Sequence, residues 1–100
     1  MRDDLPGVEL VRHGLADLTE GRTTVEALLV AIGAPRLRRL GLPVPADRFL
    51  PRFPERDLYE LLEREGRGAH SRFNALVRRL VSFERALEHA RKDAGRQAER

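Results

Sequence analysis

The sequence predicts an all-α domain, a small bundle of four short helices packed on one long C-terminal amphipathic helix. Apolar residues recur three or four positions apart in most segments, which is the spacing of one helix face. No segment alternates apolar and polar residues over the length of a strand, and glycine or proline separates most of the helical segments. The 100 residues are enough for one domain. We expect it to cover residues 1–94, with residues 95–100 as a frayed polar tail.

The first two helices are expected over residues 6–20 and 24–32. In the first, one apolar stripe is formed by Val8, Val11, Leu15 and Leu18. The second follows Thr23 and Glu26, whose spacing is that of a capping box with Thr23 as the N-cap. Only apolar residues follow Glu26 up to the end of this helix, and a helix that is apolar on every side is buried. We therefore expect residues 24–32 at the centre of the fold.

A short third helix over residues 35–40 leads into a proline-rich connector over residues 41–54. The connector holds four prolines, which exclude a regular helix. It is too apolar for a free linker, and we expect it to pack along the helices through Val44, Phe49, Leu50 and Phe53. A fourth helix is expected over residues 55–65, with a buried face formed by Leu58, Leu61 and Leu62.

The strongest pattern lies in the fifth helix, expected over residues 69–94. An apolar seam repeats at intervals of four and three residues through Ala69, Phe73, Leu76, Leu80, Phe83, Leu87, Ala90 and Ala94. This is the heptad pattern of helices that pack side by side. At about 1.5 Å per residue this helix is near 40 Å long. The first and fourth helices are too short to cover the seam along its length.

The leading functional hypothesis follows from this mismatch. We expect a non-enzymatic helical protein-protein interaction module that acts as a homo-oligomer, with a dimer favoured. Its interface would be the seam residues Phe73, Leu76, Leu80, Phe83, Leu87 and Ala90. The net charge is −3 over residues 1–33, +4 over residues 34–53, −2 over residues 54–68 and +4 over residues 69–100. Such alternation favours electrostatic pairing between copies.

A nucleic-acid-binding accessory or regulatory protein is the alternative hypothesis. The second helix, the turn at residues 33–35 and the arginine-rich third helix have the order of a helix-turn-helix, although the third helix is short for a recognition helix. A basic stripe also lies opposite the seam. The candidate phosphate or base contacts are Arg36, Arg38 and Arg39 in the third helix and Arg78, Arg85, His89 and Lys92 in the stripe. No aromatic residue interleaves the stripe, so it offers no platform for stacked bases.

A third hypothesis is a small hydrolase or nuclease centred on His70. Backbone N–H groups at the start of the fifth helix could hold an anion beside Gly68, His70, Ser71 and Arg72. The same residues also fit ordinary helix capping. Their spacing matches neither a phosphate-binding loop nor a dinucleotide fingerprint, and we assign no catalytic residue.

Composition excludes several other classes. The chain has no cysteine, so disulfides and thiolate metal sites are excluded. No two histidines stand at i, i+4 spacing, and we predict no metal site and no cofactor. The longest apolar run, residues 27–32, is far shorter than the about 20 residues of a membrane span. The acidic start has no apolar stretch behind it, and we expect a cytoplasmic protein with no membrane partner.

Overall fold

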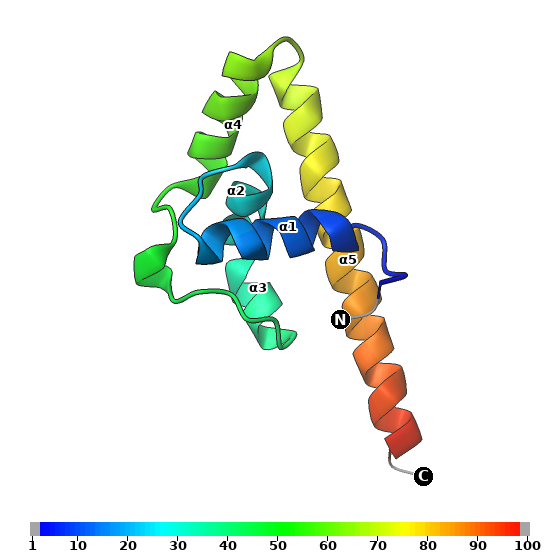
Figure 1. Ribbon diagram of the computed structural model, residues 1–100. Helices are drawn as coiled ribbons and strands as arrows, with labels where there is room; N and C mark the ends of the chain where they lie inside the picture. Colours follow the sequence, from blue (N-terminus) through cyan, green and yellow to red (C-terminus); the bar gives the residue numbers. More distant parts are fainter. Residues whose placement is uncertain (1–2, 99–100) are drawn as a thin grey trace.

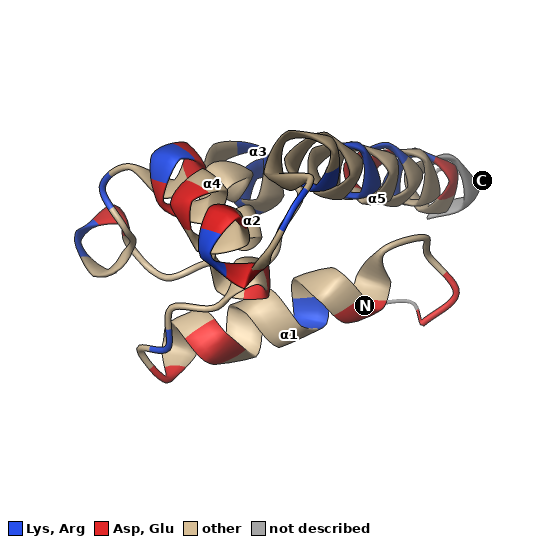
Figure 2. Cartoon of the chain, turned by 90° about the horizontal axis from the view of Figure 1, so that it is seen from above, with Lys and Arg blue, Asp and Glu red and all other residues tan. Residues whose placement is uncertain are grey.

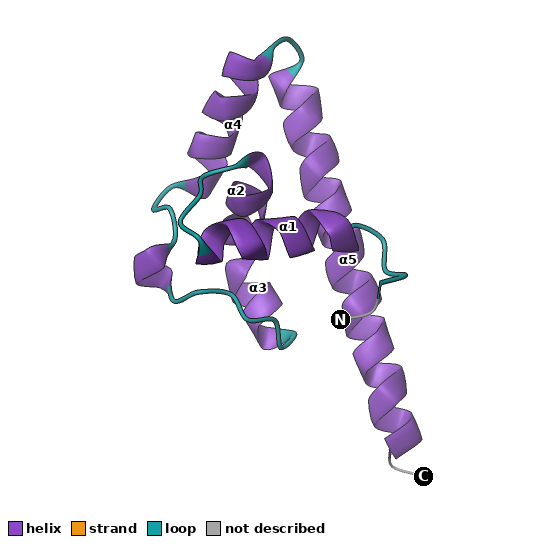
Figure 3. Cartoon of the chain, in the orientation of Figure 1, coloured by secondary structure: helices purple, strands orange, loops and turns teal. Residues whose placement is uncertain are grey.

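The computed structural model describes residues 3–98 and confirms the all-α prediction (Figures 1 and 3). The elements are α1 (Val8–Thr19), α2 (Val25–Ile32), α3 (Ala34–Arg39), the 3₁₀ turn η1 (Asp47–Phe49), α4 (Pro54–Glu65) and α5 (Ala69–Ala98). No strand occurs in the described part of the chain. The predicted bounds lie close to these, except that α5 continues through Gly95 to Ala98 where a frayed tail was expected. Residues 99–100 of that tail lie outside the described residues.

The helices α4 and α5 form a splayed hairpin, and α1 crosses its open side with α2 packed between them (Figure 1). The molecule measures 52 × 28 × 18 Å. At about 1.5 Å per residue, α5 is near 45 Å long and accounts for most of the longest dimension. Its last turns extend beyond the rest of the molecule (Figure 1).

The second helix forms the centre of the core, as its composition predicts. Ala27, Leu28, Leu29 and Val30 are fully or almost fully buried, and α1 and α4 both pack against them. The N-cap is Thr24 and not Thr23, because the extended backbone of Thr24 places its hydroxyl 3.1 Å from the backbone N–H of Ala27, which donates to it. The capping prediction is therefore wrong by one residue. The Thr24 hydroxyl also donates to Asp17 at 2.6 Å, which ties the end of α1 to the start of α2.

Two glycines of the first helix region allow close packing. Gly14 is buried where α1 crosses α2, and a Cβ at this position would overlap the carbonyl group of Glu26 and a methyl group of Val30. Gly7 precedes α1 with a φ of 77°, a left-handed conformation that favours glycine. A Cβ on Gly7 would lie 3.1 Å from the carbonyl oxygen of Arg79, so the start of α1 contacts the backbone of α5.

The connector of residues 41–54, called the strap from here on, packs on the helices through only part of its apolar content. Val44 and Leu50 contact the core as predicted. The prediction is wrong for the two phenylalanines, since Phe49 is 63% and Phe53 is 50% exposed. Leu50 takes the inward position that follows η1, and Phe49 within that turn is left in solvent.

The seam of α5 is mostly covered by its own chain. Leu80, Phe83 and Leu87 are buried in the core together with residues of α1, α2 and α4. Phe73, Leu76 and Ala90 are half-buried, Ala69 is buried and Ala94 is exposed. The expectation that the seam as a whole needs a second chain is therefore wrong. Several short elements cover α5 at successive points: α4 packs on its first turns, α2 crosses it further along, and the chain before α1 touches it at Gly7 (Figure 1).

Candidate functional site

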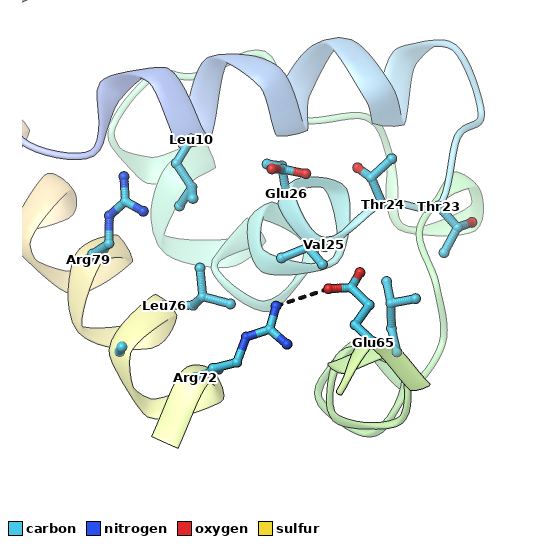
Figure 4. Close-up of a pocket in the computed structure, with 11 residues that line it drawn as sticks. Leu10, Thr23, Thr24, Val25, Glu26, Glu65, Arg72, Leu76 and Arg79 are labelled. Carbon is cyan, nitrogen blue, oxygen red and sulfur yellow. Dashed lines mark hydrogen bonds and ion pairs between the residues drawn. The ribbon is translucent and has the colours of Figure 1, made fainter. Parts of the chain in front are cut away.

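A groove of about 680 Å³ lies between the start of α2, the end of α4 and the N-terminal half of α5 (Figure 4). Its apolar lining is Leu10, Val25, Leu61, Ala75 and Leu76, and its polar lining is Thr23, Thr24, Glu26, Glu65, Arg72 and Arg79. Apolar surface with a few convergent polar groups is the usual character of a binding site. This groove is the main candidate site that the fold presents.

One ion pair joins the two walls of the groove. The guanidinium of Arg72 on α5 lies 3.0 Å from the carboxylate of Glu65 on α4 (Figure 4). Both side chains are more than two-fifths exposed, so the pair adds little stability by itself. Glu26 and Arg79 also line the groove, so its charged lining is two acidic and two basic side chains.

The residues of the predicted anion site do not converge. Arg72 lines the groove and pairs with Glu65, whereas His70 accepts or donates a hydrogen bond with Asn74 at 3.2 Å. The His70 ring also meets the edge of Tyr59 on α4, with 6.4 Å between ring centroids. Ser71 and Gly68 are exposed, and none of these three residues lines the groove. The structure therefore lends no support to chemistry centred on His70.

Two of the three α3 arginines hold the fold together. Arg36 lies 3.6 Å from Glu84 and 3.2 Å from Glu88, which joins α3 to α5. Arg38 pairs with Asp47 at 2.6 Å and donates to the carbonyl oxygen of Pro45, which anchors the strap. Arg39 is exposed. A helix of six residues in which two of the three guanidinium groups are used internally is a poor recognition helix.

The basic stripe of α5 is exposed on the outer face of the helix. Arg78, Arg85, His89 and Lys92 all point to solvent there. His89 lies 3.3 Å from Asp93, and Lys92 lies 3.8 Å from Glu88, so acidic residues of the same helix neutralise part of the stripe. The stripe lies on the exposed face where it was predicted, and its C-terminal end adjoins α3, because Glu88 lies within ion-pair distance of both Lys92 and Arg36.

Glu84 is the one buried charged side chain of the described core, at 4% exposure. Burial raises the pKa of its carboxyl above the ordinary value, and the positive charges of Arg36 and Arg39 oppose that rise. A carboxylate at this position is therefore costly for the folded state, and the ion pair with Arg36 offsets part of the cost.

The raised pKa of Glu84 predicts a pH-dependent stability. Because the pKa is higher in the folded state than in the unfolded chain, the folded state binds more protons, and this carboxyl favours folding most below pH 4.5. The contribution is lost as the pH rises through the raised pKa. Urea unfolding of the wild type and Glu84→Gln from pH 4 to 7 should show the wild type losing stability relative to the variant with rising pH. Parallel pH profiles for the two proteins would contradict the assignment.

Two features of the structure were not predicted from the sequence. The groove depends on Leu10, which lies outside the predicted stripe of α1 and is nevertheless buried. The second is the repeated pair Arg48-Phe49 and Arg52-Phe53, in which arginine guanidinium groups stack over exposed rings. The repeat is visible in the sequence, but the two phenylalanines were expected to pack against the helices and not to lie in solvent.

Within residues 3–98, no three histidine or acidic side chains gather in a way that could hold a metal ion. No helix in this range combines the length and the apolar character that crossing a membrane requires. Comparison with protein-family models, with curated proteins and with solved structures found no match to this chain.

Proposed function

We propose that this chain is a non-enzymatic interaction module that forms a homodimer through its long C-terminal helix. The observation that carries the proposal is the last part of α5, residues 92–98, which extends past the rest of the molecule (Figure 1). We call this segment the distal arm. Ala94, which continues the seam, is exposed there, so the heptad pattern runs beyond the core that covers it.

The groove of the second copy is the proposed partner of the distal arm. An amphipathic helix in an apolar groove is a recurrent mode of recognition. Antiparallel α5 helices from two copies would bring each distal arm beside the groove of the other copy, because the groove lies at the opposite end of α5. This reciprocal arrangement has two-fold symmetry and closes as a dimer.

The distribution of charge supports this pairing. The groove walls draw on residues 1–33 and 54–68, with net charges of −3 and −2, and on Arg72 and Arg79 of α5, whereas the arm has a net charge of +1 from Lys92, Asp93 and Arg96. Figure 2 shows charges of both signs on α1 and α4, with acidic residues in the majority, and mainly basic residues along α5. The opposite signs favour encounter between the arm of one copy and the groove of the other.

Three matched substitutions on α5 test the proposal, each adding one glutamate at an exposed alanine or serine. Ala94→Glu alters the arm, Ala75→Glu alters the groove wall, and Ser82→Glu alters neither. We expect light scattering after gel filtration to show a dimer for the wild type and Ser82→Glu. The first two variants should dimerise at least about tenfold more weakly, because the longer glutamate side chain would take up the space between the arm and the groove wall.

Mixing the two glutamate variants tests whether the arm of one copy binds the groove of the other. A mixture of Ala75→Glu and Ala94→Glu retains one intact arm-to-groove contact per heterodimer, so the mixture should contain more dimer than either variant alone. An Ala75→Glu variant as dimeric as the wild type would indicate contact between arms and would contradict the groove. A wild type that stays monomeric at every concentration would overturn the proposal.

A further inference from the structure

We infer that the strap carries a second binding site, which takes single-stranded nucleic acid by stacking bases on Phe49 and Phe53. Among the described residues these are the two large apolar side chains that are exposed. Flat aromatic rings with cationic groups beside them are the common platform of proteins that bind single strands.

Arginine accompanies each ring. The guanidinium of Arg48 lies 4.7 Å from the centre of the Phe49 ring. Arg52 and Arg56 lie 5.9 and 4.7 Å from the centre of the Phe53 ring. A guanidinium that stacks on a ring keeps its N–H donors at the edge, where they can bind phosphate oxygens. The strap thus offers a base platform and a phosphate contact side by side at two successive points.

The strap also borders a second hollow, of about 580 Å³, against the end of α2 and the start of α3. Its apolar lining includes Ile32, Ala34, Pro35 and Leu50, and its charged lining is Arg48, Arg52, Asp47 and Glu55. This volume falls within the about 300–1,000 Å³ of small-molecule pockets, so it is large enough for a base turned out of the strand. Prolines 51 and 54 limit the conformations of the strap, which lowers the entropy lost on binding.

The acidic groups near the rings determine which ligand fits. Asp47 is paired with Arg38, and Asp57 lies 3.5 Å from Arg56 and is two-thirds covered. Glu55 is exposed, and Asp47 and Glu55 both line the hollow together with Arg48 and Arg52, so the charges of its lining balance. Binding must therefore come from stacking as well as charge. A duplex, whose bases are already stacked, and an acidic peptide, which has no rings to stack, both fit less well.

Probes with and without stackable bases distinguish binding by stacking from binding by charge. Anisotropy of a labelled oligothymidine of about ten nucleotides at ~50 mM salt should report binding, and an abasic oligomer of equal length should bind at least fivefold more weakly. Phe49→Ala and Phe53→Ala should each weaken binding of oligothymidine by about 5- to 150-fold. Both rings are exposed, so circular dichroism should show an unchanged fold.

Charge variants locate the site. The double variant Arg48→Ala and Arg52→Ala should reduce the slope of log affinity against log salt by about 1.4, since each phosphate contact to a single strand contributes about 0.7. Arg78→Ala with Arg85→Ala removes equal charge from the outer face of α5 and should change affinity by less than about twofold. The inference fails if the α5 pair has the larger effect, or if the abasic oligomer, a duplex or polyglutamate binds as tightly as oligothymidine. It fails equally if no probe binds at all.

Discussion

Replacing Phe83 by alanine should lower the free energy of unfolding by about 3–5 kcal/mol, as large-to-small changes of buried aromatic residues do. Phe83 is the largest fully buried side chain of the core, and it contacts the start of α1 at Gly7. The loss is a large part of the about 5–15 kcal/mol that stabilises a typical domain. Urea unfolding followed by circular dichroism measures it.

Ser82→Ala is the matched control, because Ser82 precedes Phe83 on the same helix and is exposed. Its unfolding free energy should stay within about 0.5 kcal/mol of the wild type. If Phe83→Ala were as stable as this control while losing only self-association, Phe83 would belong to an interface and its place in the monomer core would be wrong.

Substitution of Gly14 by alanine should also destabilise the protein, by at least about 1–3 kcal/mol. Elsewhere in a helix this change is favourable by about 0.5–1 kcal/mol, since alanine restricts the unfolded chain. At Gly14 the added Cβ meets the backbone of Glu26, including its carbonyl carbon at 2.9 Å, and backbone cannot turn away as a side chain can. The helices α1 and α2 must therefore separate.

Gly95→Ala is the control for Gly14→Ala. Gly95 also lies inside a helix, and a Cβ there would meet nothing within 4 Å. Thermal unfolding should show Gly95→Ala at least as stable as the wild type and Gly14→Ala with a clearly lower midpoint. Equal midpoints for the two variants would show that α1 and α2 are not in close contact at Gly14.

The sequence was sufficient to predict the fold class and the positions of the helices. Periodic apolar residues and the breaks at Gly21, Gly33 and Gly41 are local signals, and they determine local structure. The buried position of α2 was equally predictable, because a helix that is apolar on every side has no polar face that could lie against solvent.

The crossing of the helices was not predictable in the same way. The seam pattern predicts that one face of α5 is buried. It does not indicate whether the residues that bury it belong to the same chain or to another. The answer depends on contacts such as that of Gly7 with Arg79, which no periodicity encodes. The groove is a product of the same crossing, since α1 and α2 meet the splayed hairpin at one level and leave a hollow beside it.

The side-chain orientations in the strap were also not predictable from the sequence. Phe49 and Leu50 are adjacent and equally apolar, yet only Leu50 packs on the core. The choice is made by the turn at η1 and by the bond of Arg38 to the strap, both of which depend on the tertiary structure. Apolar content alone cannot distinguish a side chain that packs from one held in solvent by its turn.

The central place of α2 has a consequence for how the chain folds. Its packing partner α1 precedes it directly along the chain, α3 follows directly, and α4 and α5 form a hairpin of neighbours. Most helix pairs are thus brought together by closing short loops, which carries a small entropy loss. Local pairing of this kind favours fast folding, and the contact of α2 with α4, which closes across residues 33–53, is the main non-local step. The α1–α2 corner, complete within the first third of the chain, can therefore act as the nucleus onto which the later hairpin docks.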